Sequence, residues 1–523
     1  MTERSNIARS AFSMTAATSI SRVLGFLRDM LVARFLGAGG LSDSFFVAFR
    51  VPNLLRELFA EGSMSSGVIP VLSQYNATKG QSAVAALVRV AFTFIVISAG
   101  LVCLAGIVFA PQIIHLIAPG FSSSTVKFTQ TVLLTRIMVP FLFFVSISAI
   151  VMGALNSKKI FFVPAMASAW FNIGIISTIA ALYFGLAERS VAVAIGVTIG
   201  GFFQFASQVP TFYKYEFTLK PSFTFRHPGL KQIGMLILPA TLGTAVSQFN
   251  IFISTILASY LPTGSITYLY YAMRLIQFPV GVFGVAMGMA VLPSLSEHAA
   301  RGDFDSLTKD FTFSLKLLFS ITVPSMIGLI SLGGPIVNVL FQHGHFDYLA
   351  TQGTTTALLC YSVGIWAMVG VRVVASTFYS MQDTKTPVRA AAFTLCINIA
   401  ISVILMQHLS YAGLALANAI SSSANFLILF YFLNKKLRHI AVRGIIKSFA
   451  KTLLAALSMG VAGWYLVHIR QWDSSGHTLV KSLYLTVIIG VCMGVYFAAA
   501  HLLKSEEVDY IVKMFKRKIL GRA

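Results

Sequence analysis

Charged residues are scarce in this sequence. They make up 11% of 523 residues, against roughly 25% in a typical soluble domain. Hydrophobic residues make up 56%, and the mean hydropathy is +0.80. So little polar surface cannot cover a water-soluble globule of this length. The composition therefore excludes a cytoplasmic enzyme, a disordered chain and a secreted disulfide scaffold, and it indicates a protein whose main solvent is lipid.

Cysteines are also few, and each stands alone in an apolar run. No pair has the spacing of a metal site, a redox motif or a disulfide framework, so we interpret them as small core residues. They are Cys103, Cys360, Cys396 and Cys492.

The usual motifs of catalysis are missing as well. There is no phosphate-binding loop, so the chain encodes no ATPase. His343 and His345 stand in a predicted outer loop beside Asp347, and we interpret that pair as incidental. We therefore expect no enzyme activity, no cofactor and no metal site, and any transport must draw on a gradient or a downstream sink.

Long apolar runs take up most of the chain, and a membrane-spanning helix needs about 20 such residues. Because the runs do not alternate in polarity, strands are excluded. The sequence predicts an all-α polytopic membrane protein with about 14 transmembrane helices. The expected spans are 7–36, 41–62, 84–110, 128–154, 161–184, 190–212, 232–260, 265–293, 310–332, 353–380, 387–407, 411–433, 447–468 and 479–502.

Basic residues give the orientation. Lys and Arg exceed Asp and Glu by 39 to 17, and most of them gather in alternate loops, such as those at 158–159, 214–231 and 435–447. The intervening loops at 37–41, 111–124, 261–264 and 333–350 contain no Lys or Arg, whereas Arg189, Arg470 and Lys481 are exceptions. The positive-inside rule places both termini in the cytoplasm. We also expect the first helix to be retained rather than cleaved as a signal peptide.

An internal repeat divides the chain. Residues 48–53 resemble 272–277 at an offset of 224, and residues 68–73 resemble 291–296 at an offset of 223. The offset spans six predicted helices, so both copies cross the membrane in the same direction, as in parallel repeats. We expect two six-helix lobes, at 1–220 and 228–440, around a central cavity. Two additional helices at 441–503 lie outside the repeat, and 504–523 forms a basic amphipathic helix on the inner surface.

Ionisable residues inside predicted spans are costly and usually face a cavity or a partner. Arginine outnumbers the carboxylates among them, which indicates a cationic cavity for an anionic ligand, because the guanidinium fork binds phosphate through paired hydrogen bonds. The alternative is helix locking by ion pairs, with Arg22 on Asp29 and Arg50 on Asp43 or Glu57. The set comprises Arg22, Arg28, Asp29, Arg34, Asp43, Arg50, Arg56, Glu57, Glu61, Arg136, Arg274 and Arg372.

Geometry and position sort this set. We favour a ligand role for Arg22, Arg28, Arg56 and Arg274, although Arg28 and Arg56 lie off the main polar faces of their helices. Pairing is favoured for Arg50, Glu57 and Glu61, the role of Arg372 stays open, and Arg34 and Arg136, near predicted helix ends, are expected to snorkel.

Several motifs resemble the MurJ/MviN family of bacterial lipid II flippases. The first-helix motif is Ser21-Arg22-Val23-Leu24-Gly25-Phe26-Leu27-Arg28-Asp29, and further resemblance lies at 34–39, 42–49, 52–56, 59–62, 270–274, 278–281 and 379–387. The resemblance covers nearly the whole chain. It places the protein in the multidrug/oligosaccharidyl-lipid/polysaccharide exporter superfamily.

The resemblance implies a fold, a cargo and a site. It implies fourteen helices, alternating access and lipid II, an undecaprenyl-diphosphate glycolipid, as cargo in the bacterial inner membrane, with the last two helices forming a groove for the lipid tail. It implies further contacts with membrane lipids and with cell-wall synthesis machinery, and no nucleic acid. The cavity residues carry over onto Arg22, Arg28, Asp43, Arg56 and Arg274. Supporting or pairing positions are Asp29, Arg50, Asn53, Glu57, Glu61 and Arg372.

Some positions depart from the family pattern. Met273 stands where many members have Asp, Gln277 replaces a frequent Glu, and Glu57 stands where a second Arg is common. Sodium-coupled relatives use carboxylates in the second lobe, and its predicted spans contain none, so we expect coupling to the membrane potential. The alternatives are a flippase for another undecaprenyl-linked saccharide and a multidrug-cation antiporter, whose cavity would be richer in carboxylates.

Overall fold

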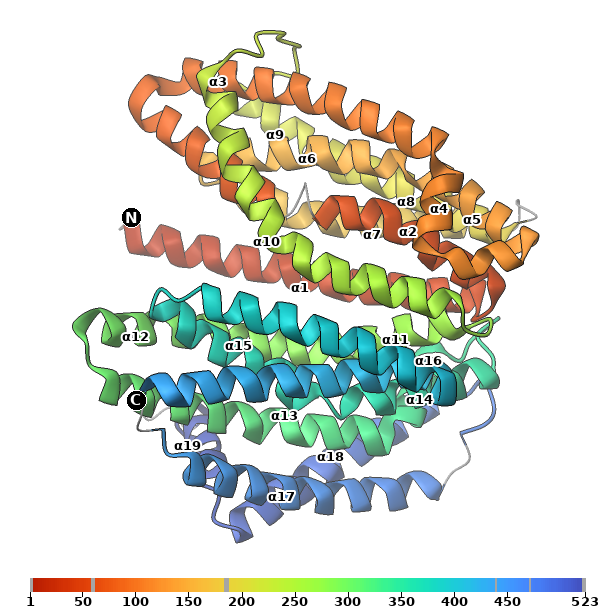
Figure 1. The fold of residues 1–523 in the computed structure, drawn as a ribbon, viewed down its shortest axis with the longest axis vertical. Helices are drawn as coiled ribbons and strands as arrows, with labels where there is room; N and C mark the ends of the chain where they lie inside the picture. The colour runs from red at the N-terminus through yellow and green to blue at the C-terminus, as the bar shows by residue number, and fades with distance from the viewer. Residues whose placement is uncertain (1–2, 58–61, 183–187, 438–439, 470–471, 520–523) are drawn as a thin grey trace. The chain divides into compact units, whose positions relative to one another are not determined.

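The computed structural model describes residues 3–57, 62–182, 188–437, 440–469 and 472–519. These residues form helices and connecting turns without a strand, so the predicted all-α class is confirmed. The chain divides into two compact units, Met1–Gly264 and Ser265–Ala523, and both can be followed in Figure 1.

In the first unit, α8 packs on both α6 and α7. Around them α1 packs on α7, α3 on α6, α2 on α5, and α10 on α3. Close approach is possible because small residues line the helix contacts: a Cβ atom added to Gly174 of α7 would lie 2.5 Å from the Cα atom of Gly200 in α8. The elements are α1 (Glu3–Leu36), α2 (Gly40–Arg56), α3 (Gly62–Val108), α4 (Ala110–Ile117), η2 (Pro119–Ser123), α5 (Thr125–Met138), α6 (Pro140–Ser157), α7 (Phe162–Leu182), α8 (Arg189–Ala206), α9 (Val209–Lys214) and α10 (Pro228–Ser259).

The segment between the predicted spans 41–62 and 84–110 is helical rather than an open loop. It forms the first part of α3, and Val68, Val71, Leu72 and Tyr75 are buried at helical spacing. Gly80, with φ of +79°, ends this part and redirects the chain. The left-handed backbone there suits glycine, because a Cβ atom is strained at that φ.

In the second unit, α13 is the central helix and packs on α12, α14, α15 and α17. Its elements are α11 (Ser265–Pro279), the π-helix η3 (Val280–Gly284), α12 (Val285–Arg301), α13 (Phe304–Phe341), α14 (Tyr348–Ser362), α15 (Ile365–Ser380), α16 (Lys385–Leu437), α17 (Val442–His468), α18 (Thr478–Leu502) and α19 (Glu506–Ile519).

The 53-residue element α16 contains a reversal. Ser410 has a φ of +52°, and a Cβ atom added to Gly413 would lie 2.4 Å from the carbonyl oxygen of Leu405. Eight residues of straight helix would separate these positions by roughly 12 Å, so the chain turns back between the predicted spans 387–407 and 411–433.

Within the described ranges, nine helices are long and apolar enough to cross a membrane, or ten if the bent pair α14 and α15 is one span. Both counts take α16 as a single helix. The chain is therefore a multi-pass membrane protein, while the number of about 14 crossings stays a prediction.

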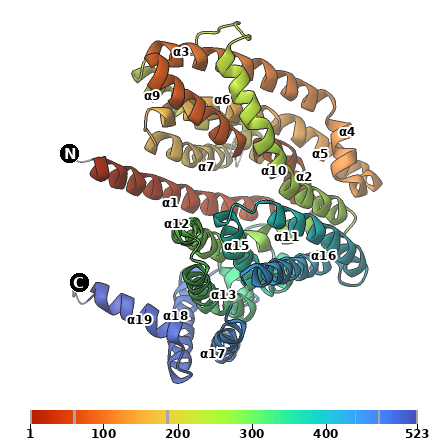
Figure 2. The same ribbon diagram turned by 60° about the vertical axis from the view of Figure 1, so that its left-hand side comes forward.

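The last two long helices pair with each other and rest on α13 (Figure 2). A buried polar network joins the loop between α17 and α18 to α13. Lys481 of α18 is 3% exposed and donates to Asn338 Oδ1 of α13 at 3.1 Å and to the carbonyl oxygen of Ser474. Asn338 Nδ2 donates to the carbonyl oxygen of Trp472 at 2.6 Å. Lys481, an exception to the loop charge pattern, thus anchors the α17–α18 hairpin.

Replacing Lys481 with methionine is expected to lower the stability of the second unit. The change keeps the side-chain volume but removes charged hydrogen bonds, which contribute on the order of 2 kcal/mol when buried. Thermal unfolding of the purified protein should show a midpoint several degrees lower. Lys447→Met, at an exposed position of α17, is the matched control, and equal midpoints for the two variants would contradict the anchoring role.

A second polar link closes the α15–α16 turn. Lys436 Nζ, near the end of α16, donates to Asp383 Oδ2 at 2.9 Å. Asp383 also accepts from the Thr386 backbone N–H at 3.1 Å and from its hydroxyl at 2.9 Å. The hydrogen bond from Lys436 is the main reason that the pKa of Asp383 falls from 3.8 to about 2.

Asp383→Asn is expected to destabilise the protein by about 1 kcal/mol at neutral pH, a modest value because Lys436 is exposed to screening solvent. Asparagine still caps the helix, so the change isolates the ion pair. Since the folded pKa lies below the unfolded one, this stability is present above pH 3.8 and is lost as pH falls through about 2. Unfolding midpoints of variant and wild type should therefore converge across that window. A Lys436→Gln variant should give a similar loss, and the double variant should add little to it.

The C-terminal element α19 begins at Glu506, within the region 504–523 that the sequence assigns to an amphipathic helix. Its first turn packs on α13, where Glu507 is 5% and Val508 1% exposed, and the Lys316 Nζ lies 4.0 Å from Glu507 Oε1. The acidic first turn agrees with the positive end of the helix dipole.

Candidate functional site

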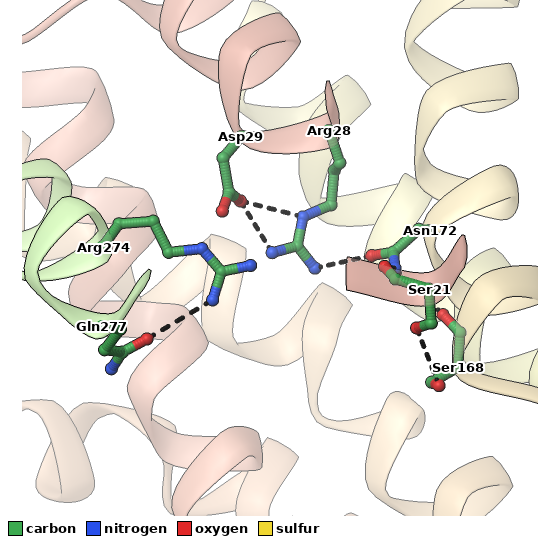
Figure 3. Close-up of polar contacts among 7 residues, drawn as sticks. All are labelled: Ser21, Arg28, Asp29, Ser168, Asn172, Arg274 and Gln277. Carbon is green, nitrogen blue, oxygen red and sulfur yellow. Dashed lines mark hydrogen bonds and ion pairs between the residues drawn. The ribbon is translucent and has the colours of Figure 1, made fainter. Parts of the chain in front are cut away.

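The described part of α1 holds an arginine in a fixed polar setting. The Arg28 side chain is 13% exposed, and its Nε and Nη2 atoms donate to Asp29 Oδ1 at 3.0 and 2.7 Å. Its Nη1 donates to Asn172 Oδ1 of α7 at 3.1 Å (Figure 3). Its guanidinium carbon lies 5.8 Å from the centre of the Phe171 ring. These contacts fix the direction in which the guanidinium points.

Asn172 extends this cluster into a link between α1 and α7. Its Nδ2 donates to the carbonyl oxygens of Ser21 at 3.2 Å and Ser168 at 3.0 Å. The hydroxyls of Ser21 and Ser168 lie 2.9 Å apart (Figure 3). The Asn172 amide therefore donates to two helix carbonyl oxygens through its nitrogen and accepts a hydrogen bond from Arg28 on its oxygen.

Asp29 forms an ion pair with Arg28, its neighbour in sequence. Asp29 is 3% exposed, so its carboxylate is removed from water and needs the guanidinium. Arg22, one of the predicted ligand residues, is exposed on α1.

A second polar group lies at the end of α2. Arg56 donates through Nε and Nη2 to Asn53 Oδ1 at 3.1 and 2.9 Å, and Asn53 Nδ2 donates to Glu57 Oε1 at 3.0 Å. Gln248 of α10 donates to Glu57 Oε2 at 2.5 Å. Arg56 and Glu57 also lie within 3.7 Å. Spacings of three and four residues bring the α2 side chains together on one helix face.

Asp43 occupies a different environment from the arginines. It lies in the first turn of α2, is 2% exposed, and accepts a hydrogen bond from the backbone N–H of Gly264 at 2.6 Å. Gly264 has a φ of +95° and directly precedes α11. The buried carboxylate of Asp43 thus holds the turn at Gly264.

Arg50 is half-buried on α2. Glu61 lies outside the described residues.

In the second unit, Arg274 lies on α11 and is half-buried. Its Nη1 lies 3.5 Å from Gln277 Oε1, one turn further along (Figure 3). This distance is long for an N–H···O hydrogen bond.

The π-helix that follows α11 places a glycine under Arg372 of α15. A Cβ atom added to Gly284 would lie 3.1 Å from Arg372 Cδ, so the aliphatic part of the Arg372 side chain packs on Gly284. Arg372 as a whole is exposed. Short π-helical turns often mark functional sites.

Sequence reasoning missed two members of these clusters, Asn172 and Gln248. Each is an amide within a mainly apolar stretch of its helix, and a polar residue at membrane depth is the signal that could have singled it out. Their arginine and carboxylate partners are 144 and 191 residues away in the chain, so the pairing itself needs the tertiary structure.

Chemically, the two clusters of the first unit present guanidinium groups beside amides and carboxylates. Such groups bind anions and carry no nucleophile with an adjacent base. Among the described residues no group of His, Cys, Asp and Glu could hold a metal ion.

Comparison with known proteins identifies the family. Residues 32–484 match the family described as "Lipid II flippase MurJ". The chain is 32% identical over 516 residues to the probable lipid II flippase MurJ of Buchnera aphidicola subsp. Schizaphis graminum, covering 98% of this chain and 100% of that one. It is 33% identical to the Vibrio cholerae protein of the same description, covering 96% and 97%.

Solved structures agree. A structure described as lipid II flippase MurJ in an inward closed conformation matches with a TM-score of 0.75 at 25% identity, covering 97% of this chain and 99% of that one. An inward-facing multidrug transporter of the MATE family matches with a TM-score of 0.67 at 13% identity, covering 82% and 98%, which shows a shared fold. From the family match and the relatives of similar length, the chain belongs to the MurJ family of lipid II flippases.

Proposed function

We propose that this chain flips lipid II from the cytoplasmic to the periplasmic leaflet of the bacterial inner membrane. The observation that carries the proposal is the match to the MurJ family over residues 32–484. The half-buried, oriented guanidinium of Arg28 supports it, because an anionic cargo needs such a donor in a place of low dielectric.

In this proposal Arg22, Arg28, Arg56 and Arg274 contact the diphosphate. Guanidinium groups stay charged at membrane depth and donate paired hydrogen bonds to phosphate oxygens. Asp29 and Asn172 orient Arg28, and Asn53 orients Arg56. No bond of the cargo is made or broken, so the protein acts as a transporter and not as an enzyme.

The membrane arrangement is also proposed. Lobes at 1–220 and 228–440 alternate access to a central cavity, both termini lie in the cytoplasm, and the isoprenoid tail stays in lipid against the α17–α18 hairpin. The loop charges support this orientation, and the parallel repeat supports the two-lobed mechanism.

Depletion of the protein in its own host tests the function. We expect lipid II to accumulate on the cytoplasmic leaflet, detected by an enzyme or antibiotic probe that reaches one leaflet only. Accumulation of a different undecaprenyl-linked saccharide would support the first alternative. Drug sensitivity without any build-up of precursor would support the antiporter, whose fold this chain shares.

Collapse of the membrane potential is expected to reduce lipid II flipping at least several-fold, because the predicted spans of the second lobe offer no sodium-binding carboxylate. Proteoliposomes with a potassium diffusion potential provide the measurement, and an ionophore that removes only the sodium gradient serves as control. Full activity without potential, in the presence of a sodium gradient, would refute this coupling.

A further inference from the structure

A pocket of about 310 Å³ lies in the first unit, apart from the arginine clusters. It is lined by Gln81 of α3, Lys158 directly after α6, and Lys214, Tyr215 and Glu216 at the end of α9. The loop charges assign this side of the unit to the cytoplasm. The proposed transport of lipid II uses none of these residues.

The wall formed by the end of α9 is built rigidly. Phe212 and Phe217 are fully buried and stack with ring centres 5.1 Å apart. Between them the backbone turns through Glu216, whose φ is +63°, and the Phe217 N–H donates to the Phe212 carbonyl oxygen at 3.2 Å. The turn is thus fixed from both sides, and the side chains of Lys214 and Glu216 start from defined positions.

Aromatic residues place the pocket at the level of lipid headgroups. Tyr213 is 51% and Tyr215 40% exposed on the same turn. Tyrosine gathers at the membrane–water interface because its ring suits lipid and its hydroxyl suits water. A pocket beside these rings is within reach of a headgroup whose acyl chains stay in the bilayer.

Two ammonium groups give the pocket its charge. Lys158 Nζ donates to Asn76 Oδ1 at 2.8 Å, which holds the lysine beside the pocket. Lys214, which also lines the pocket, is exposed. With Glu216 as the one acidic residue in the lining, the pocket carries a net positive charge and suits a singly charged phosphodiester.

Gln81 adds a hydrogen-bond acceptor. Its Nε2 donates to the carbonyl oxygen of Tyr215 at 3.2 Å. A carbonyl can only accept, so this bond fixes the amide with its oxygen pointing away from Tyr215. In the described part of the chain Gln81 Oε1 is buried and has no hydrogen-bond donor. Such an acceptor is costly unless a donor reaches it.

We propose that this pocket binds an anionic phospholipid whose headgroup carries hydroxyl groups, of the phosphatidylglycerol type. Its phosphodiester lies between Lys158 and Lys214, and a headgroup hydroxyl donates to Gln81 Oε1. Gln81 lines the pocket and its Oε1 is buried, so binding of the headgroup has to displace the side chains that cover this oxygen. The acyl chains extend past Tyr213 into the inner leaflet.

The test uses the full-length protein in neutral detergent, with bound lipid measured by native mass spectrometry. Wild type should bind phosphatidylglycerol about threefold or more tightly than phosphatidylmethanol, which has the same charge and no headgroup hydroxyl. Lys158→Gln with Lys214→Gln should weaken phosphatidylglycerol binding on the order of tenfold. Gln81→Met should bring the two lipids to equal affinity.

Lys159→Gln is the matched control, because Lys159 is an exposed neighbour outside the pocket lining. An equal loss in Lys159→Gln and in the double lysine variant would overturn the proposal, since binding would then follow net charge alone. Equal affinity of wild type for the two lipids would overturn it without any variant. If free sn-glycerol 3-phosphate displaced the lipid at equal concentration, the site would be one for a soluble phosphate ester and the lipid assignment would be wrong.

Discussion

Arg28→Ala is expected to abolish lipid II transport and to reduce the amount of folded protein. Arg28 is the ion-pair partner of Asp29, which is 3% exposed, at 2.7 Å. Removing the guanidinium takes a charged partner from a buried carboxylate, and breaking such a buried pair costs roughly 3–5 kcal/mol. A loss of growth in cells with this variant as sole copy would therefore mix a folding defect with a binding defect.

A double variant separates these two effects. Arg28→Gln with Asp29→Asn removes both charges together and keeps side chains that can bond each other and Asn172. The protein level in the membrane should then recover to near that of wild type. Transport should stay at least a hundredfold lower, an order of magnitude expected when phosphate recognition by a guanidinium in low dielectric is lost. Reconstituted flipping of lipid II, normalised to protein, provides the measurement.

Two further variants test whether transport requires the guanidinium of Arg28 in particular. Arg28→Lys keeps the charge but loses the planar fork, so it should also fail. Arg136→Ala is the control, because Arg136 is an exposed arginine whose Nε bonds the carbonyl oxygen of Ile107, and near-normal growth is expected. Recovery of transport in the double variant would show that Arg28 and Asp29 only lock the helix, and would remove Arg28 from the proposed site.

The Arg28 cluster also shows how far a sequence can predict a site. The opening motif predicts the family and marks the arginine, and the family is confirmed. On an ideal helical wheel Arg28 lies off the polar face of its helix. In the structure its long side chain reaches Asn172 on α7, a partner 144 residues away. A wheel describes the Cβ directions of one helix and contains no information on which second helix lies beside it.

The fold was likewise only partly predictable from the sequence. Hydropathy predicts the apolar helices because their lengths follow the thickness of the bilayer. It does not predict the helical first part of α3, where a short apolar run that includes Val68, Val71 and Leu72 is followed by polar residues, because that part is buried on one face only. Nor does it assign α10, which the sequence repeat groups with the second lobe, while its contacts with α3 place it in the compact unit Met1–Gly264. Repeat patterns record ancestry, whereas packing depends on the side chains that meet.

Asp43→Ala is expected to lose transport at least tenfold, whereas Asp43→Asn should retain most of it. We propose that Asp43 is a positioning residue, because a carboxylate repels a diphosphate and this one is buried. Its Oδ2 accepts the Gly264 N–H at 2.6 Å, and alanine leaves that buried donor unsatisfied at a cost of about 1–3 kcal/mol. The asparagine oxygen replaces the acceptor and keeps the turn at Gly264 in position.

Flipping rates and unfolding midpoints of the two variants provide the measurement, since a positioning role predicts that both recover together in Asp43→Asn. Lys127→Met is the control in the same region: Lys127 Nζ bonds the Thr263 hydroxyl at an exposed site, so a small effect is expected. If Asp43→Asn folded normally but transported as poorly as Asp43→Ala, the charge itself would be required. Asp43 would then act directly on the cargo or on the conformational cycle, because the bond to Gly264 would have been retained without restoring function.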